Sequence, residues 1–524
     1  MNTDLLYIGV AFLVAFVLYY IIPLKFRWIV LLCVSLGFYV FIMDAPIYFF
    51  VFVIVTAIGV YLSALGIQRR NDKATANTEI TDAEKKKIKR LNKASIVVTI
   101  LFNLGILAFL KYFNFFGESI ISFINLFHAG IKFRGLKLFL PLGISFYTLS
   151  AISYLVDVHR KKYAAEKNPF KILAFLTFFA SIIEGPILRY DQDGRQIVEG
   201  HRFEYKNFTH GAQRVLWGLF KKVVIADRAF LIVNTIASAP TQYSGAASLF
   251  FILGYTLQLY ADFSGFMDIA LGIAEMFGIK LPENFRQPFF AKGPQEFWQR
   301  WHITLGTWFK EYIFYTVALT NGMKKFTKAV KKKHKNHFTK TLPTIVALFC
   351  VWFCNGLWHG PRWSYIVYGL YYFVIISLGM LFEPLWKKMW EKLKVKQNSI
   401  WLSLMRHIRT LLIIFVGETI FWSGDPGHSL KEAFYILGSI FTPYKGSLLG
   451  LGLDWTEVLV LVLSVAVLIV VDTLKEKKIN IRDGIDKLVL PARWFIYLAG
   501  IAIVLIFGAY GDIYVMVPFM YGGY

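Results

Sequence analysis

Apolar runs long enough to cross a membrane recur along nearly the whole chain and are separated by short polar segments. A hydrocarbon core of about 30 Å requires about 20 apolar residues in a helix. By this measure the pattern predicts membrane spans at 5–22, 27–43, 47–67, 95–116, 137–157, 212–238, 246–262, 342–358, 362–382, 405–422, 456–472 and 494–510. We therefore expect an all-α polytopic membrane protein with about twelve transmembrane helices.

Three weaker apolar runs, at 118–131, 171–188 and 264–278, are shorter or more polar than the others. We expect these runs to be re-entrant or interfacial. Chain length alone would suggest roughly three or four soluble domains. Because no long polar stretch and no internal repeat interrupts the apolar pattern, we expect a single integral-membrane domain over 1–524 instead.

The composition excludes an ordinary soluble enzyme. Hydrophobic residues make up 56% of the chain and charged residues 17%, against about 25% charged residues in soluble domains. The first apolar run follows an acidic residue and has no small-residue cleavage site after it, so it predicts a retained helix and not a signal peptide. Three cysteines, Cys33, Cys350 and Cys354, all lie inside apolar runs, which excludes a disulfide framework.

The net charge of +24 is concentrated in short segments between apolar runs. This distribution is typical of cytoplasmic loops of membrane proteins, and the chain has no basic module of the kind that binds nucleic acid. Placing 69–93, 323–340, 387–396 and 475–493 in the cytoplasm puts both termini outside. We expect a multi-pass protein of the cell membrane, with 68–94 and 323–340 as solvated or frayed helical loops.

The stretch 281–315 has more charges than a membrane span tolerates. Starting at Pro294, apolar and aromatic side chains recur at helical spacing, namely Phe297, Trp298, Trp301, Leu305, Trp308, Phe309 and Tyr312. This pattern predicts one amphipathic helix lying in the membrane interface. His302 lies at the margin of its apolar stripe, and taken alone it fits a structural hydrogen bond better than catalysis.

A second unusual segment, 353–363, ends a strongly apolar run. Gly356, Gly360 and Pro361 are expected to break the helix around His359, and breaks at membrane depth are tolerated mainly where the backbone lines a cavity. A histidine at such a place is either functional or is satisfied by a neighbouring helix.

Other polar residues in apolar surroundings allow two interpretations. Asp262 is either part of a substrate cavity or a helix-capping residue. Glu184 and Arg189 either contribute to the same cavity wall or form a structural ion pair with one another.

At five ordered motifs the chain resembles the membrane-bound O-acyltransferase family, and within it the branch that O-acetylates exported polysaccharides such as alginate. The resemblance covers about 140–372, whereas the helices of 1–139 and 373–524 match only in hydropathy. The motifs are LPLGISFYTLSAISYLVDVHR, FFASIIEGPILRYD, GLFKKVVIADR, LQLYADFSGFMDIALGIAEMFGIKLPENFRQPFFAKGPQEFWQRWHITLGTWFKEYIFY and GLWHGPRWSYIVYGLYY.

The resemblance implies a ring of tilted helices around a thinned centre, where funnels from the two membrane faces meet. It implies transfer of an acyl group from a cytoplasmic thioester, either acetyl-CoA or an acylated carrier protein, toward hydroxyls of an exported polysaccharide. The expected partners are this donor, an extracytoplasmic acetyltransferase helper protein, the polysaccharide and the bilayer. No tightly bound cofactor and no metal are expected.

The family's two characteristic histidines map onto His302 and His359. Hydroxyl acylation needs a base, and histidine has a suitable pKa near pH 7, so we assign His359 as the base and His302 as the residue that orients the donor or assists protonation. The residues expected to line the donor funnel are Asp262, Asn284, Arg300, Trp301 and Trp358.

No G-x-S-x-G motif is present, and a nucleophilic role for Cys350 or Cys354 is disfavoured because both precede His359 by one or two helical turns. His334 and His337 are expected to be solvated loop residues rather than zinc ligands. They lie in the basic segment 323–340, where relatives usually carry a shorter turn.

Three alternative functions stay open. The chain resembles relatives that transfer D-alanine onto teichoic acids, so the acyl group could be D-alanyl. Twelve crossings with intramembrane charges also suit a transporter or flippase, although transporters often have broken helices in both halves. The third alternative is a structural subunit whose histidines are vestigial.

Overall fold

The computed structural model describes residues 3–43, 49–77, 79–127, 130–333, 336–396, 399–446 and 450–510. Over these residues the chain is helical, and its only β contacts are two isolated bridges. The described chain forms two compact units. Among the described residues, the first comprises 3–215 and Met267–Pro282, and the second comprises Leu216–Phe266 and 283–510. The all-α class predicted from the apolar pattern is confirmed.

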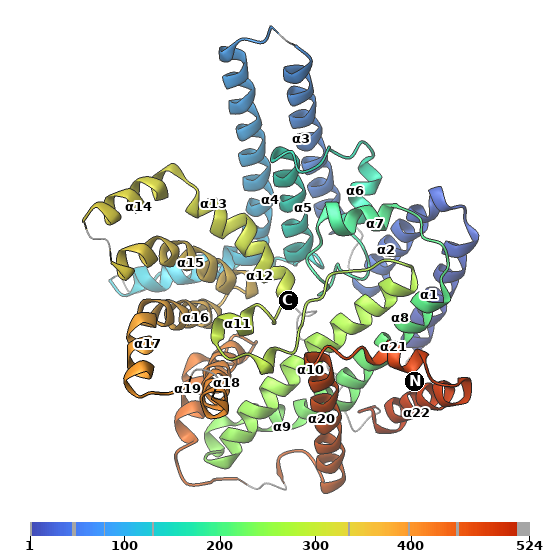
Figure 1. Cartoon of the computed structure of the whole chain (residues 1–524), viewed down its shortest axis with the longest axis vertical. Helices are drawn as coiled ribbons and strands as arrows, with labels where there is room; N and C mark the ends of the chain where they lie inside the picture. Colours follow the sequence, from blue (N-terminus) through green and yellow to red (C-terminus); the bar gives the residue numbers. More distant parts are fainter. Residues whose placement is uncertain are drawn as a thin grey trace. The chain divides into compact units, whose positions relative to one another are not determined.

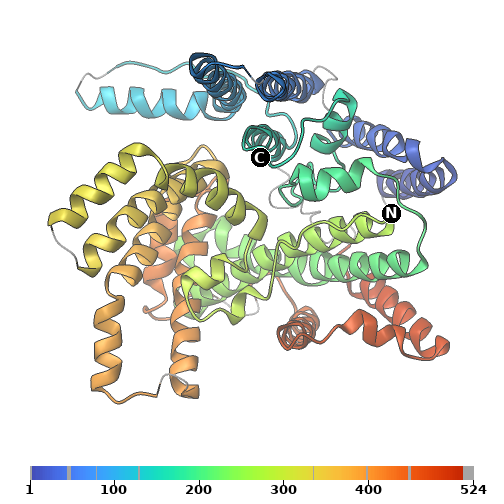
Figure 2. The same ribbon diagram turned by 45° about the horizontal axis from the view of Figure 1, so that its top comes forward.

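The first unit is built around a bundle of long helices. Helices α3 and α4 run side by side, and α5 contacts both (Figures 1 and 2). Its helices are α1 (Thr3–Ile21), α2 (Arg27–Met43), α3 (Phe50–Ala76), α4 (Asp82–Asn125), α5 (Ile144–His159), α6 (Pro169–Leu176), α7 (Arg195–Val198) and most of α8 (Tyr205–Leu219).

The segment 68–94, expected to be a solvated or frayed helical loop, is mostly regular helix. Helix α3 continues to Ala76, and α4 starts with a capping box in which Thr81 and Glu84 bond reciprocally. Such a box satisfies backbone N–H groups at a helix start. At 1.5 Å per residue, the 44 residues of α4 exceed the thickness of a bilayer core, so its charged first turns extend beyond the apolar part.

The second unit contains the remaining helices, including the larger part of α10. It includes both segments that the sequence singled out for unusual chemistry. Its helices are α9 (Asp227–Ser238), α10 (Ala246–Met276, with its last residues in the first unit), α11 (Pro294–Trp298), α12 (Ile303–Phe309), α13 (Tyr315–Ala318), α14 (Asn321–Lys333), α15 (His337–His359), α16 (Trp363–Leu381), α17 (Glu383–Lys392), α18 (Ile400–Trp422), α19 (Leu430–Ser439), α20 (Trp455–Glu476), α21 (Ile481–Asp486) and α22 (Leu490–Phe507).

Eight helices in the described residues are long and apolar enough to span a membrane, so the structure does not reach the predicted count of twelve. Helices α2 and α5 have 17 and 16 residues, short of a full span. The expected span 212–238 is divided by a π-helical segment, Phe220–Ala226. The run 264–278, expected to be re-entrant, is mostly the second half of α10, a continuous helix of 31 residues.

Helices α15 and α16 form a closely packed antiparallel pair through two glycines. A Cβ on Gly356 would collide with the carbonyl oxygen of Tyr365, and one on Gly369 with the carbonyl oxygen of Trp352. Gly356 was expected to break the helix, but α15 runs through it and ends at His359. This glycine therefore serves the approach of two backbones, and the break comes after His359.

Candidate active site

The aromatic segment after Pro294 is not the single amphipathic helix that its spacing predicted. Helix α11 ends at Trp298 and α12 begins at Ile303, and between them His302 adopts a left-handed conformation with φ +46° and ψ +53°. For a non-glycine residue this conformation costs roughly 1–2 kcal/mol. The break therefore needs tertiary support that a helical pattern does not reveal.

The support comes from the segment that follows α10. The backbone N–H of Ile303 donates to the carbonyl of Asn284 at 3.0 Å, and that of Arg286 donates to the carbonyl of Arg300 at 2.9 Å. Phe285 and Trp301 form an antiparallel bridge between these bonds. Strained backbone persists only where the surrounding structure over-determines it, and such residues cluster at functional sites.

The hydrogen bonds of the Asn284 side chain determine the tautomer of His302. The backbone N–H of Thr304 donates to Oδ1 of Asn284 at 3.0 Å, so this oxygen is an acceptor. Nδ1 of His302 lies 3.2 Å from the same oxygen and must therefore carry the hydrogen. Nε2 then has its lone pair available, because a neutral imidazole has one donor and one acceptor nitrogen.

Burial keeps His302 neutral. The residue is 3% exposed, and desolvation lowers the pKa of its imidazole to about 3. Within the described residues, Nε2 is buried and has no hydrogen-bond partner. The site thus presents a neutral hydrogen-bond acceptor that resists protonation at physiological pH.

His359 is held by aromatic rings. It is the last residue of α15 and is buried. The centroid of its ring lies 4.9 Å from that of Phe421, 5.0 Å from Trp358, 5.7 Å from Tyr368 and 6.1 Å from Tyr365. These rings come from α15, α16 and α18, so His359 lies where three helices of the second unit converge.

One indole connects the two histidines. The ring of Trp358 lies 5.6 Å from that of His302 and 5.0 Å from that of His359. The sequence placed His302 at a membrane interface, apart from the break at His359. The structure instead brings both into one aromatic cluster, which includes Phe263 of α10 in edge contact with His302 at 5.0 Å.

Asp262 lies in the middle of α10, so the capping interpretation is wrong. Its carboxylate pairs with the ammonium of Lys222 at 2.6 Å, and Lys222 also pairs with Asp227 at 2.9 Å. Asp262 and Lys222 are both buried. Since a buried charge is tolerated only with partners, this group ties the π-helical segment to α10, one residue before Phe263.

Arg300 and Trp301, also expected to line the donor funnel, have extensive contacts within the protein. The guanidinium of Arg300 pairs with Glu296 at 2.8 Å and with Glu476 of α20 at 2.7 Å. The indole of Trp301 stacks on Phe297 at 5.5 Å. These contacts hold α11 and the residues before His302 in place, and a direct role toward a substrate stays a prediction for both residues.

Glu184 and Arg189 belong to the first unit and are both buried. The backbone N–H of Arg189 donates to the Asp193 carboxylate at 2.7 Å. Their participation in a cavity wall with the histidines stays a prediction.

The remaining sequence candidates lie elsewhere. Cys350 and Cys354 are free, half-buried thiols on α15. His337 is exposed, as expected, but it starts α15 instead of lying in a loop, and its Nε2 donates to the carbonyl of Met380 at 2.8 Å. His334 lies outside the described residues.

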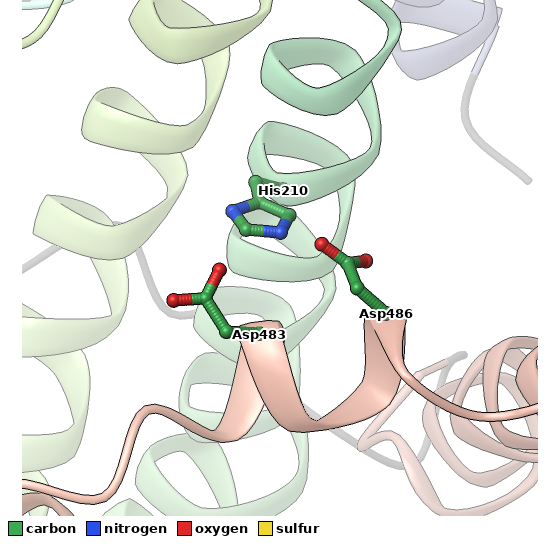
Figure 3. A group of neighbouring side chains, drawn as sticks. All are labelled: His210, Asp483 and Asp486. Atoms are coloured by element: carbon green, nitrogen blue, oxygen red, sulfur yellow. The ribbon is translucent and has the colours of Figure 1, made fainter.

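No metal centre is assigned within the described part of either unit. Figure 3 draws His210, on α8 of the first unit, together with Asp483 and Asp486, which stand one turn apart on α21 of the second. The second unit contributes only these two carboxylates, fewer than the three or four protein ligands that zinc sites usually have.

Sequence reasoning missed Thr304, Lys222 and Phe421. Two adjacent lysines in the apolar motif GLFKKVVIADR were a signal for buried charge. Thr304 and Phe421 carried no such signal, because an ordinary threonine or phenylalanine gains its role only through contacts with distant segments.

The sequence model of the membrane-bound O-acyltransferase family matches residues 148–416. The chain is 31% identical over 353 residues to the probable alginate O-acetylase AlgI of Pseudomonas syringae pv. tomato, covering 66% of this chain and 60% of the relative. It is 32% identical over 325 residues to the peptidoglycan O-acetyltransferase of Helicobacter pylori, covering 56% of each.

A third relative is the teichoic acid D-alanyltransferase of Bacillus subtilis, which is 30% identical over 296 residues, covering 55% of this chain and 69% of the relative. The chain thus spans about 60% of the length of the alginate O-acetylase relative that it matches.

Proposed function

Because the chain belongs to the membrane-bound O-acyltransferase family, we propose that it moves an acetyl group from a cytoplasmic thioester toward hydroxyls of an exported cell-surface polysaccharide. The donor is acetyl-CoA or an acetylated carrier protein, and an extracytoplasmic acetyltransferase completes the transfer to the polymer. Two relatives whose names state O-acetylation, of alginate and of peptidoglycan, support acetyl as the acyl group.

The observation that carries the proposal is the pairing of two differently held histidines on one indole. The depressed pKa of His302 makes its imidazole a poor proton acceptor near pH 7, since a general base works best with a pKa near the operating pH. His302 is suited instead to accept a hydrogen bond at Nε2 and so to hold the donor or the incoming hydroxyl. His359 then serves as the base.

The transfer follows from these roles. The acceptor hydroxyl oxygen attacks the thioester carbonyl carbon while His359 takes the hydroxyl proton. The tetrahedral intermediate collapses, the carbon–sulfur bond breaks, and the proton passes from His359 to the departing sulfur. The products are an ester and a free thiol, and no covalent acyl-enzyme is needed.

The test measures acetylation of polymer in membranes containing the full chain, the extracytoplasmic acetyltransferase, the polymer and an isotope-labelled acetyl donor. His359→Ala should lower the rate by about 10²–10⁴-fold, the usual value of a positioned base, with an unchanged amount of inserted protein. His407→Ala is the matched control, because this histidine of the same unit contacts a backbone carbonyl of Ala291 and neither site histidine. Full activity of His359→Ala would exclude the proposed base.

A second candidate, D-alanyl transfer toward teichoic acid, rests on the D-alanyltransferase relative. Labelled acetyl and labelled D-alanyl thioesters supplied to the same membranes separate the two. Label in polymer from the D-alanyl donor alone would replace the acetyl proposal and leave the histidine roles intact. A transporter would move substrate across vesicles without consuming any thioester, and its activity would not depend on His359.

A further inference from the structure

Helix α14 carries a one-sided cluster of lysines. On one side of the helix, the half-buried side chains of Met323, Thr327 and Val330 form a stripe. At 100° per residue, the lysines fall within an arc of about 120° on the opposite side. These are Lys324, Lys325, Lys328, Lys331 and Lys332, all exposed, and the helix contains no acidic residue.

A second helix with exposed lysines starts at the same end of the α15/α16 pair. The bond from His337 Nε2 to the carbonyl of Met380 joins the start of α15 to the end of α16. Helix α14 precedes α15, and α17 follows α16. The figures show both α14 and α17 at this end of the pair (Figures 1 and 2). Lys387 and Lys388 of α17 are exposed, although Lys387 pairs with Glu383 at 2.7 Å.

This end of the pair coincides with a membrane surface. Helices α15 and α16 are both long and apolar enough to span a bilayer, so their joined ends lie at the level of the headgroups. Phe338, Leu385 and Trp386 are more than half exposed here. Aromatic side chains and lysines together are typical of the membrane interface.

We propose that the α14–α17 surface, defined as Lys324, Lys325, Lys328, Lys331 and Lys332 together with Lys388 and Trp386, binds anionic phospholipid headgroups. Clusters of four to eight basic residues beside a membrane span attract the negative charge of a leaflet. The proposal is independent of acyl transfer and of which leaflet the surface faces.

Position and side-chain chemistry favour lipid over an acidic protein. The lysines of α14 start within a few residues of a membrane span, and large apolar side chains stand beside them at the same level. A lipid headgroup layer accommodates the lysines and the apolar side chains together. The lysine ammonium groups reach the phosphates, while the aromatic rings enter the boundary of the acyl chains. A soluble acidic partner would leave Phe338 and Trp386 without a matching surface.

The experiment places a polarity-sensitive dye on α14 of the full chain. Ala329→Cys provides the attachment point on an exposed position of the helix, in a background where Cys33, Cys350 and Cys354 are replaced by serine. The protein is reconstituted in nanodiscs of phosphatidylcholine alone or with about a third phosphatidylglycerol. We expect dye emission at shorter wavelength in the anionic discs, reversed by 1 M salt, at which the screening length falls to about 3 Å.

Two charge-matched variants test the lysines themselves. Replacement of the five α14 lysines by glutamine should remove most of the spectral shift. The control replaces five exposed lysines at the start of α4, which should leave the shift at Ala329→Cys unchanged. These are Lys85, Lys86, Lys87, Lys89 and Lys93.

Equal emission in both kinds of disc would overturn the proposal, as would an equal loss of the shift in the α4 control. A shift produced by soluble polyglutamate in phosphatidylcholine discs, without one from phosphatidylglycerol, would indicate an acidic protein partner instead. The salt titration needs no lysine substitution, so it decides the question even if the five-glutamine variant does not fold.

Discussion

The two histidines of the second unit are held by opposite means. His302 lies in a strained turn, and its Nδ1–H donates a hydrogen bond to Oδ1 of Asn284, while the backbone of the next residue bonds to the carbonyl of Asn284. His359 ends a regular helix and is surrounded by aromatic rings. Hydrogen bonding to one nitrogen determines the tautomer of His302, whereas the rings around His359 determine its position. The contrast is compatible with the roles proposed above, a neutral acceptor at 302 and a base at 359.

The same substitution at both positions tests this contrast most strongly. Glutamine keeps a neutral hydrogen-bond acceptor but cannot take up a proton. His359→Gln should lower acetylation by about 10²–10⁴-fold, whereas His302→Gln should lose about tenfold or less, the value of one imperfect hydrogen bond. Initial rates with labelled donor, normalised to inserted protein, measure both. Equal losses at the two positions would remove the distinction between their roles.

The next largest effect is expected at Asn284. In Asn284→Asp the carboxylate still accepts from Thr304 and His302, but its charge stabilises the imidazolium and raises the pKa of His302. The protonated imidazole carries a hydrogen on Nε2, so this nitrogen can no longer accept a hydrogen bond. An increase of about 1–3 brings the pKa to at most about 6, so we expect activity to fall by up to about twofold at pH 6 and further at lower pH, with recovery at higher pH.

The pH profile separates this effect from simple disruption. A purely structural role of Asn284 would give a loss that does not vary with pH. Gln299→Glu adds the same charge at an exposed position three residues from His302 and should keep the profile of the unchanged chain.

The third prediction concerns the packing of α15 against α16, one turn before His359. Gly356→Ala places a methyl group against the carbonyl of Tyr365, and we expect the free energy of unfolding to fall by about 1–3 kcal/mol. Thermal unfolding in detergent measures the change. Gly379→Ala on α16 is the control, because a Cβ there meets nothing within 4 Å. Equal stability of the two variants would show that the close crossing of α15 and α16 is not required.

The smallest effect concerns pH and stability. The pKa of His302 is about 3 in the folded chain and about 6.5 when unfolded. Between these values the imidazole of the unfolded state binds more protons than that of the folded state. The contribution of His302 to the free energy of unfolding is therefore complete above pH 6.5 and is lost as pH falls. At pH 5.5 we expect the free energy of unfolding to be lower by about 1.4 kcal/mol because of this histidine.

The measurement compares unfolding of the unchanged chain and of His302→Gln between pH 7.5 and 5.5 in detergent. The difference between the two slopes isolates this histidine from the other titrating groups. Parallel slopes would mean that His302 is not held neutral by burial.

Local patterns predicted the all-α membrane class of the protein, and this prediction is confirmed. Apolar runs at 342–358 and 362–382 correspond closely to α15 and α16, because a membrane span is recognisable from one continuous stretch. Within the described residues the count of twelve is not confirmed. The apolar stretch Gly9–Ile21, the shorter helices α2 and α5 and the divided segment at 212–238 all fall below the length of a span. The left-handed residue inside the aromatic segment was not predicted either, since its spacing fits an unbroken helix.

The sequence by itself determined the helical membrane class, the family resemblance and the identity of the two histidines, since each depends on residues adjacent along the chain. Only the tertiary structure decided that His302 is a neutral acceptor, that Trp358 joins it to His359, and that Asp262 pairs with Lys222. These features depend on contacts between residues that are 18, 56 and 40 positions apart. Tautomer, burial and charge pairing are properties of such contacts, and they exist only after distant helices have packed together.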